Sequence, residues 1–67
     1  MKSFAVGDVI RDSYMKRCGI VVFVHKTDEV KYVVDYGECW FGMYEHEMKP
    51  ATEKQKAAFL EKYNNHG

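Results

Sequence analysis

The amino-acid sequence predicts a mainly β protein, a small antiparallel barrel of four to five strands followed by a C-terminal α-helix. Short runs rich in β-branched and aromatic residues recur between positions 4 and 50. Tight polar or glycine-containing turns separate these runs, and short strands at regular spacing are typical of a small barrel. After Pro50, the only proline, the apolar residues follow helical spacing instead.

The length of 67 residues predicts a single domain over positions 1–67, with the barrel at 4–50 and the helix at 52–63. A chain this short buries only about 60% of the surface that it exposes when unfolded, so its core gives little stability to spare. One amphipathic helix of about three turns is unstable alone. We therefore expect the helix to pack on the barrel.

The strands are expected at 4–10, 18–26, 30–36 and 39–44, and residues 45–49 form either a 3₁₀ turn or a fifth strand. The loop at 11–17 and the turns at 27–29 and 37–38 connect them. The run at 18–26 is apolar on both faces, so we expect the terminal helix or another subunit to cover the side that carries Val21 and Phe23. In the next strand, Tyr32, Val34 and Tyr36 share one face.

The helix has a recognisable start. Thr52 is the expected N-cap, and Gln55, three residues later, completes a capping box. Phe59 and Tyr63 continue an apolar stripe with Leu60 and with Ala57.

The order of four segments resembles a known architecture. These segments are 6–10 (with Gly7-Asp8), 19–22, 33–38 (with Asp35-Tyr36-Gly37) and 47–50 (ending in Pro50). The order is similar to that of SH3-like barrels of the Tudor and KOW type, over about residues 4–50. In Tudor domains asparagine usually follows the Asp-Tyr-Gly turn, whereas Glu38 stands here. The resemblance implies a barrel that binds proteins or nucleic acids.

Composition narrows the function classes. Lys and Arg together number 10, as do Asp and Glu, so the formal net charge is zero and no global positive field favours nucleic acid. No apolar run approaches the roughly 20 residues of a membrane helix. Two cysteines without a signal peptide favour reduced thiols and a cytoplasmic protein.

Aromatic and acidic residues gather around the turn at 37–38. We expect a protein-binding rim there, formed by Tyr14, Asp35, Tyr36, Glu38, Trp40 and Tyr44. Ring faces with neighbouring carboxylates attract cations, so a Tudor-like cage for a methylated cationic side chain is one alternative. The other is that Tyr36 and Trp40 pack inside the barrel.

Nucleic acid is the alternative partner. The residues that would hold phosphates are Arg11, Lys16, Arg17, Lys26 and Lys31. No cysteine or histidine pair has zinc-site spacing, and nothing orients His46 toward Cys39 as a catalytic base, so we expect no metal, no cofactor and no enzyme activity. A free-standing domain of this size is typical of small bacterial or phage accessory proteins. We therefore expect a monomer or homodimer that docks on and modulates a larger protein or protein–nucleic-acid assembly, with no membrane partner.

Overall fold

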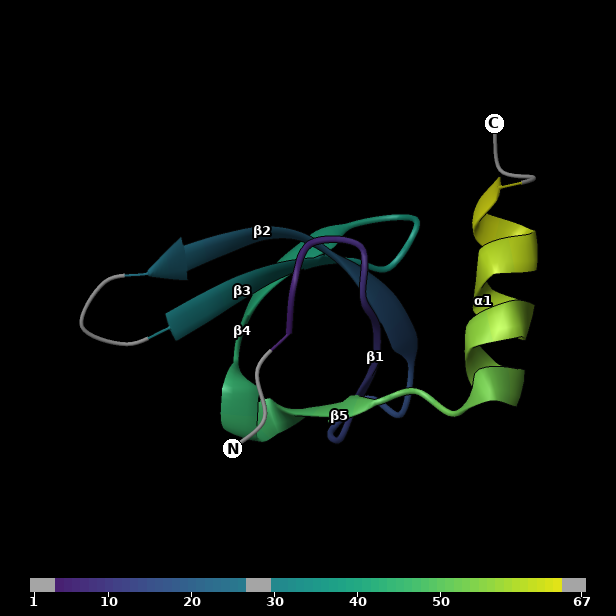
Figure 1. The fold of residues 1–67 in the computed structure, drawn as a ribbon, viewed down its shortest axis with the longest axis horizontal. Coiled ribbons are helices and arrows are strands. Elements are labelled where there is room, and N and C mark those ends of the chain that lie inside the picture. Colours follow the sequence, from purple (N-terminus) through teal and green to yellow (C-terminus); the bar gives the residue numbers. More distant parts are fainter. Residues whose placement is uncertain (1–3, 27–29, 65–67) are drawn as a thin grey trace.

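Five short strands and one α-helix make up the part of the chain that the structure, a computed structural model, describes: residues 4–26 and 30–64 (Figure 1). In chain order the elements are β1 (Val9–Asp12), β2 (Cys18–Lys26), β3 (Val30–Asp35), β4 (Trp40–Tyr44), the 3₁₀ helix η1 (Glu45–Glu47), β5 (Met48–Pro50) and α1 (Glu53–Asn64). The strands form one antiparallel sheet in the order β4-β3-β2-β1-β5. The predicted mainly β fold with a C-terminal helix is confirmed.

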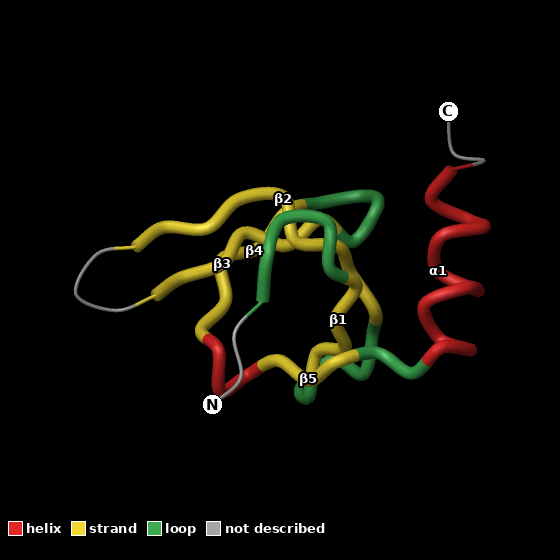
Figure 2. The backbone as a smooth tube through the Cα atoms, in the orientation of Figure 1, coloured by secondary structure: helices red, strands yellow, loops and turns green. Residues whose placement is uncertain are grey.

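The central strand β2 belongs to both halves of a strongly curved sheet (Figure 2). Its beginning pairs with β1 and the rest pairs with β3. The register with β3 shifts between Val21 and Phe23, so Val22 is the extra residue of a β-bulge. Val21 is buried and Val24 packs against the core, whereas Phe23 lies on the opposite face and is 49% exposed.

The core lies on the concave side of this sheet. Tyr32, Val34 and Tyr36 all contribute to it, which confirms the predicted alternation of the third strand. The complete core cluster contains Ile10, Val21, Tyr32, Val34, Tyr36, Met43 and Met48.

The first strand starts later than its apolar pattern predicts. Residues 4–8 are not a strand: Gly7 adopts a φ of 98°, and the Asp8 carboxylate accepts a hydrogen bond from the Ala5 N–H at 2.8 Å. A left-handed glycine and a side chain that closes a local turn both interrupt an extended strand. The strand then continues through Asp12, two residues into the predicted loop.

The turn after β3 has the predicted position and a defined geometry. The Tyr36 N–H donates to the Cys39 carbonyl at 2.9 Å, and Gly37 has a φ of 102° that favours glycine. The flanking strands end at Asp35 and restart at Trp40, one residue short of the prediction on each side. Both alternatives for 45–49 occur, η1 first and β5 after it, with Pro50 as the last strand residue. The predicted turn at 27–29 and the chain end at 65–67 lie outside the described residues.

The helix α1 packs beside the sheet, where it contacts β1 and β2. The capping box is confirmed: the Gln55 N–H donates to Thr52 Oγ1 at 3.1 Å, and the Thr52 N–H donates to Gln55 Oε1 at 3.0 Å. No residue of α1 is fully buried. The expectation that the helix covers Val21 and Phe23 is wrong, because the bulge sends Val21 into the core and leaves Phe23 at the surface.

Candidate functional site

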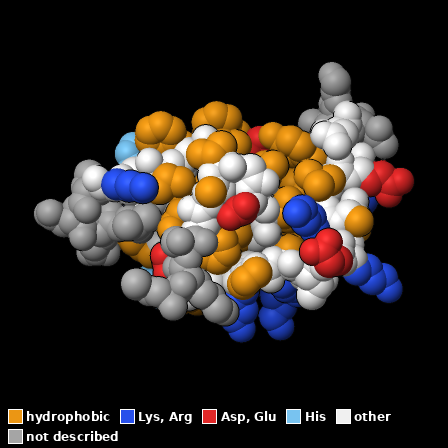
Figure 3. Space-filling view, viewed as in Figure 1, with side chains coloured by type: hydrophobic (Ala, Val, Ile, Leu, Met, Phe, Trp, Pro, Cys, Tyr) orange, Lys and Arg blue, Asp and Glu red, His pale blue; other side chains and the backbone are white. Residues whose placement is uncertain are grey.

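Exposed aromatic side chains gather on the outer face of β2, β3 and β4, the face that points away from the core. In the strand register, Phe23 lies beside Val33 and Val33 beside Gly42. Since side chains alternate between faces along a strand, Trp40 and Tyr44 share the outer face with Gly42. We call Phe23, Val33, Trp40, Gly42 and Tyr44 the aromatic face. Figure 3 shows hydrophobic side chains at the surface along the edge of the molecule where β2 and the turn after β3 lie.

Trp40 is the most exposed of the three rings on this face, with 63% of its surface accessible. The neighbouring rings are held in place by polar side chains. Lys31 lies over the Tyr44 ring, with Nζ 5.8 Å from the centroid, and the His25 ring packs edge-on against Phe23 at 4.6 Å. A large exposed ring on a rigid strand loses little side-chain freedom when it is buried by a partner, and such rings commonly dominate binding energy.

Tyr36 occupies the opposite position, inside the core, and is only 6% exposed. Its hydroxyl donates a hydrogen bond to Asp12 Oδ2 at 2.9 Å and lies 2.9 Å from the sulfur of Met43. Burial raises the pKa of the Tyr36 hydroxyl, and the hydrogen bond to the Asp12 carboxylate raises this pKa further. Tyr36 therefore anchors the loop that follows β1 to the core.

The ring face of Tyr36 already carries a cation. The Arg17 guanidinium lies over it, with Cζ 5.0 Å from the centroid, and Arg17 Nη2 is 3.5 Å from Glu38 Oε1. A ring and a carboxylate are the groups that would attract a methylated cation. In this structure both groups engage the protein's own arginine.

The six residues predicted to form one rim are divided among different surroundings. Trp40 and Tyr44 lie on the aromatic face, whereas Tyr14 lies on the loop after β1 and is 78% exposed. Asp35 is buried, and its carboxylate is satisfied there: Oδ2 accepts a hydrogen bond from the Tyr63 hydroxyl of α1 at 2.9 Å, and Oδ1 accepts one from the Gly37 N–H. The remaining two, Tyr36 and Glu38, are both engaged with Arg17.

The basic residues of the nucleic-acid alternative also form two separate groups. Arg11, Lys16 and Arg17 surround the loop after β1, and Arg11 pairs with the first residue of β2. Lys26 and Lys31 lie at the far end of the β2–β3 hairpin. The two ends of β2 are eight residue-to-residue steps apart, a span of about 26 Å. The structure thus brings no more than part of the basic set to one place.

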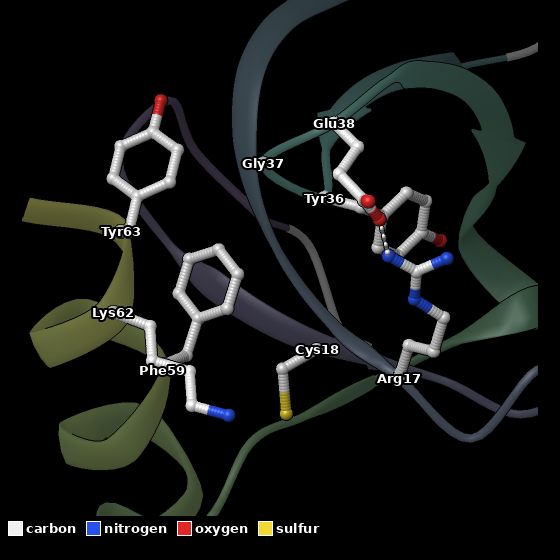
Figure 4. Close-up of a pocket in the computed structure, with 8 residues that line it drawn as sticks. All are labelled: Arg17, Cys18, Tyr36, Gly37, Glu38, Phe59, Lys62 and Tyr63. Carbon is white, nitrogen blue, oxygen red and sulfur yellow. Dashed lines mark hydrogen bonds and ion pairs between the residues drawn. The ribbon is translucent and has the colours of Figure 1, made fainter. Parts of the chain in front are cut away.

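A cleft that the sequence pattern did not predict lies between α1 and the turn after β3. It has a volume of about 410 Å³ and is lined by Arg17, Cys18, Tyr36, Gly37, Glu38, Phe59, Lys62 and Tyr63. Figure 4 shows the rings of Phe59 and Tyr63 on the helix side and the Arg17–Glu38 pair on the other. Phe59 and Tyr63 stack at 5.4 Å, one helical turn apart. That i, i+4 aromatic pair was the sequence signal for a helix surface facing the sheet.

The described residues contain no group of three histidine, cysteine or acidic side chains placed to hold a metal ion. No helix within residues 4–26 and 30–64 is long and apolar enough to cross a membrane. Cys18 and Cys39 are both half-buried and form no disulfide with each other.

Comparison with protein-family models, curated proteins and solved structures found no match to this chain.

Proposed function

We propose that this protein is a non-enzymatic docking module that binds a partner protein through the aromatic face. The observation that carries the proposal is the exposure of Trp40 on a paired strand, in register with the row formed by Gly42, Val33 and Phe23. An exposed apolar patch on a small folded domain is typical of an interaction site. Trp and Tyr are also enriched among the residues that contribute most to binding protein partners.

The fold supports an SH3-like barrel as the architecture of this module. The strand order β4-β3-β2-β1-β5 and the 3₁₀ helix between β4 and β5 agree with the resemblance to Tudor and KOW barrels. The resemblance does not extend as far as the ligand. A methyl-cation cage built on Tyr36 would need Arg17 to leave its ring, so we favour protein docking at Trp40.

Single-stranded nucleic acid is the second candidate for the same face. Bases stack on exposed rings, and Lys31 beside Tyr44 provides one cation for a phosphate. Zero net charge and the separation of the basic residues favour a protein partner instead. The two candidates differ in their response to salt, because each phosphate contact contributes about one unit to the logarithmic salt slope.

The test compares Trp40→Ala with Tyr14→Ala, a matched loss of an exposed ring from a loop. Each variant is immobilised and used to capture partners from extract of the native cells, with and without nuclease treatment. We expect Trp40→Ala to lose the captured protein and Tyr14→Ala to retain it, with both circular dichroism spectra unchanged. Equal capture by both variants would contradict the proposal. Capture that disappears after nuclease treatment, or that falls steeply with salt, would assign the face to nucleic acid.

A further inference from the structure

The strand β4 lies at one end of the sheet order, so in the described structure it pairs with β3 alone. In an antiparallel pair, alternate residues direct their N–H and C=O groups toward the partner, and the others direct them away. The turn bond from Tyr36 to Cys39 fixes this alternation. Continuing it along the register of β4, Phe41 and Met43 bond to β3, whereas Trp40, Gly42 and Tyr44 direct their backbone groups to the open edge.

Only one end of this edge is protected within the described residues. The Tyr44 N–H donates to Glu47 Oε1 at 2.9 Å, so this one amide is already engaged and does not donate to an added strand. Trp40 and Gly42 are exposed. Natural edge strands normally carry lysines, prolines or bulges that prevent pairing. Here β4 carries exposed aromatic residues instead, which makes it a template for an added strand.

The positive charge of Lys31 beside this edge indicates which residue type an added strand would carry there. The Lys31 side chain crosses over Gly42: a Cβ built on Gly42 would lie 2.5 Å from Lys31 Cε and 3.2 Å from Nζ. The ammonium group therefore sits above the backbone of β4, next to the position of any residue paired with Gly42. Among the described residues, the ion pair that forms is Arg17–Glu38. No carboxylate of these residues therefore lies within 4 Å of Lys31 Nζ.

Among residues 4–26 and 30–64, by contrast, the acidic groups near β4 are engaged. Glu47 accepts from the Tyr44 N–H, Glu45 accepts from the Tyr32 hydroxyl at 3.2 Å, and Asp35 accepts from Tyr63. A second copy of the chain, paired antiparallel about Gly42, would bring two Lys31 ammonium groups together at the symmetry axis. Like charges in that position oppose self-association.

We propose that β4 binds an extended segment of the partner protein as an additional antiparallel strand, with an acidic residue opposite Gly42 and apolar residues two positions to either side. The acidic side chain meets Lys31, and the apolar side chains lie beside Trp40 and Tyr44. Neighbouring strands are about 4.8 Å apart, which is within reach of the Lys31 ammonium. The inference rests on the proposed docking function and specifies its partner.

The test is an NMR titration of the ¹⁵N-labelled full chain with a synthetic peptide capped at both ends. The peptide has seven residues: glutamate at the centre, valine two positions to each side, and threonine elsewhere. We expect the peptide to perturb the amide signals of Trp40 and Gly42 and to slow the hydrogen exchange of the Gly42 amide. Replacing the central glutamate by lysine should weaken binding at least tenfold. The Lys31→Glu variant should reverse this preference.

N-methylation separates strand addition from simple contact of side chains. A methyl group on the central peptide nitrogen removes the N–H that faces β4 and should weaken binding at least tenfold. A methyl group on the next nitrogen, which faces away, should change binding less than twofold. Equal effects of the two methyl groups, no binding at millimolar peptide, or protection of the Gly42 amide by self-association would each overturn the proposal. If Trp40→Ala abolishes partner capture while the two methyl groups act equally, docking stands and strand addition fails.

Discussion

The hydrogen bond from the Tyr36 hydroxyl to Asp12 holds the loop after β1 to the core, and its contribution to the free energy of unfolding can be measured directly. The change Tyr36→Phe removes only the hydroxyl and keeps the ring that packs in the core. Asp12 is 5% exposed, and its other oxygen accepts from the Tyr14 N–H at 2.7 Å, so the carboxylate stays in place with one oxygen unpaired. Hydrogen bonds to charged groups contribute about 1.5–3 kcal/mol. We expect the free energy of unfolding to fall by about 2 kcal/mol.

The assay is urea unfolding followed by far-ultraviolet circular dichroism. For a domain of this size, a loss of about 2 kcal/mol corresponds to a decrease in melting temperature of about 8–16 °C. The matched control is Tyr14→Phe, which removes a hydroxyl from a largely exposed ring and should change stability by less than about 0.5 kcal/mol. If Tyr36→Phe unfolds at the same urea concentration as the unmodified protein, the bond to Asp12 adds nothing to stability and our view of this anchor is wrong.

Three further predictions concern pH and the helix. Burial and Asp12 raise the pKa of the Tyr36 hydroxyl in the folded protein. The hydroxyl therefore contributes its full stability below the unfolded pKa of about 10, and this contribution is lost as the pH rises further. In urea titrations above that pH, the stability difference between the unmodified protein and Tyr36→Phe should shrink. Truncation after Pro50 should leave a folded, less stable β-sheet domain in calorimetry, since no residue of α1 is fully buried; complete loss of the melting transition would contradict this packing. Thr52→Ala should destabilise the protein by about 1 kcal/mol in urea, and Thr52→Ser, which keeps the capping oxygen, by much less.

The sequence predicted the parts of the fold that follow from local chemistry. The alternation of Tyr32, Val34 and Tyr36 placed all three side chains in the core, and the Thr52–Gln55 capping box located the helix start. The β-bulge was not predictable, because it falls within a run of β-branched residues with no glycine or proline to mark it. The extra residue, Val22, reverses the face of the sheet on which every later side chain of β2 lies.

The length of the turn between β3 and β4 decides whether Tyr36 and Trp40 share a face of the sheet. If Gly37 and Glu38 form a two-residue turn, Tyr36 and Cys39 pair and share a face, so Trp40 must lie on the other. The sequence signal for separating Tyr36 from Trp40 was therefore present in the spacing. The Arg17–Tyr36 contact and the cleft beside α1 had no such signal, because both join segments that are distant in the chain.

The bulge at Val22 has a consequence for how the length of this protein can change. Val22 has no partner of its own on β3, so deleting it would leave every other pairing of the β2–β3 hairpin intact. Because residues 21 and 22 are both valine, deleting either one gives the same chain, whereas deleting Phe23 would place Val22 opposite Val33 and remove the ring from the outer face. The Val21-Val22 pair is therefore the place in β2 where the chain can lose one residue and still present Phe23 to the outside.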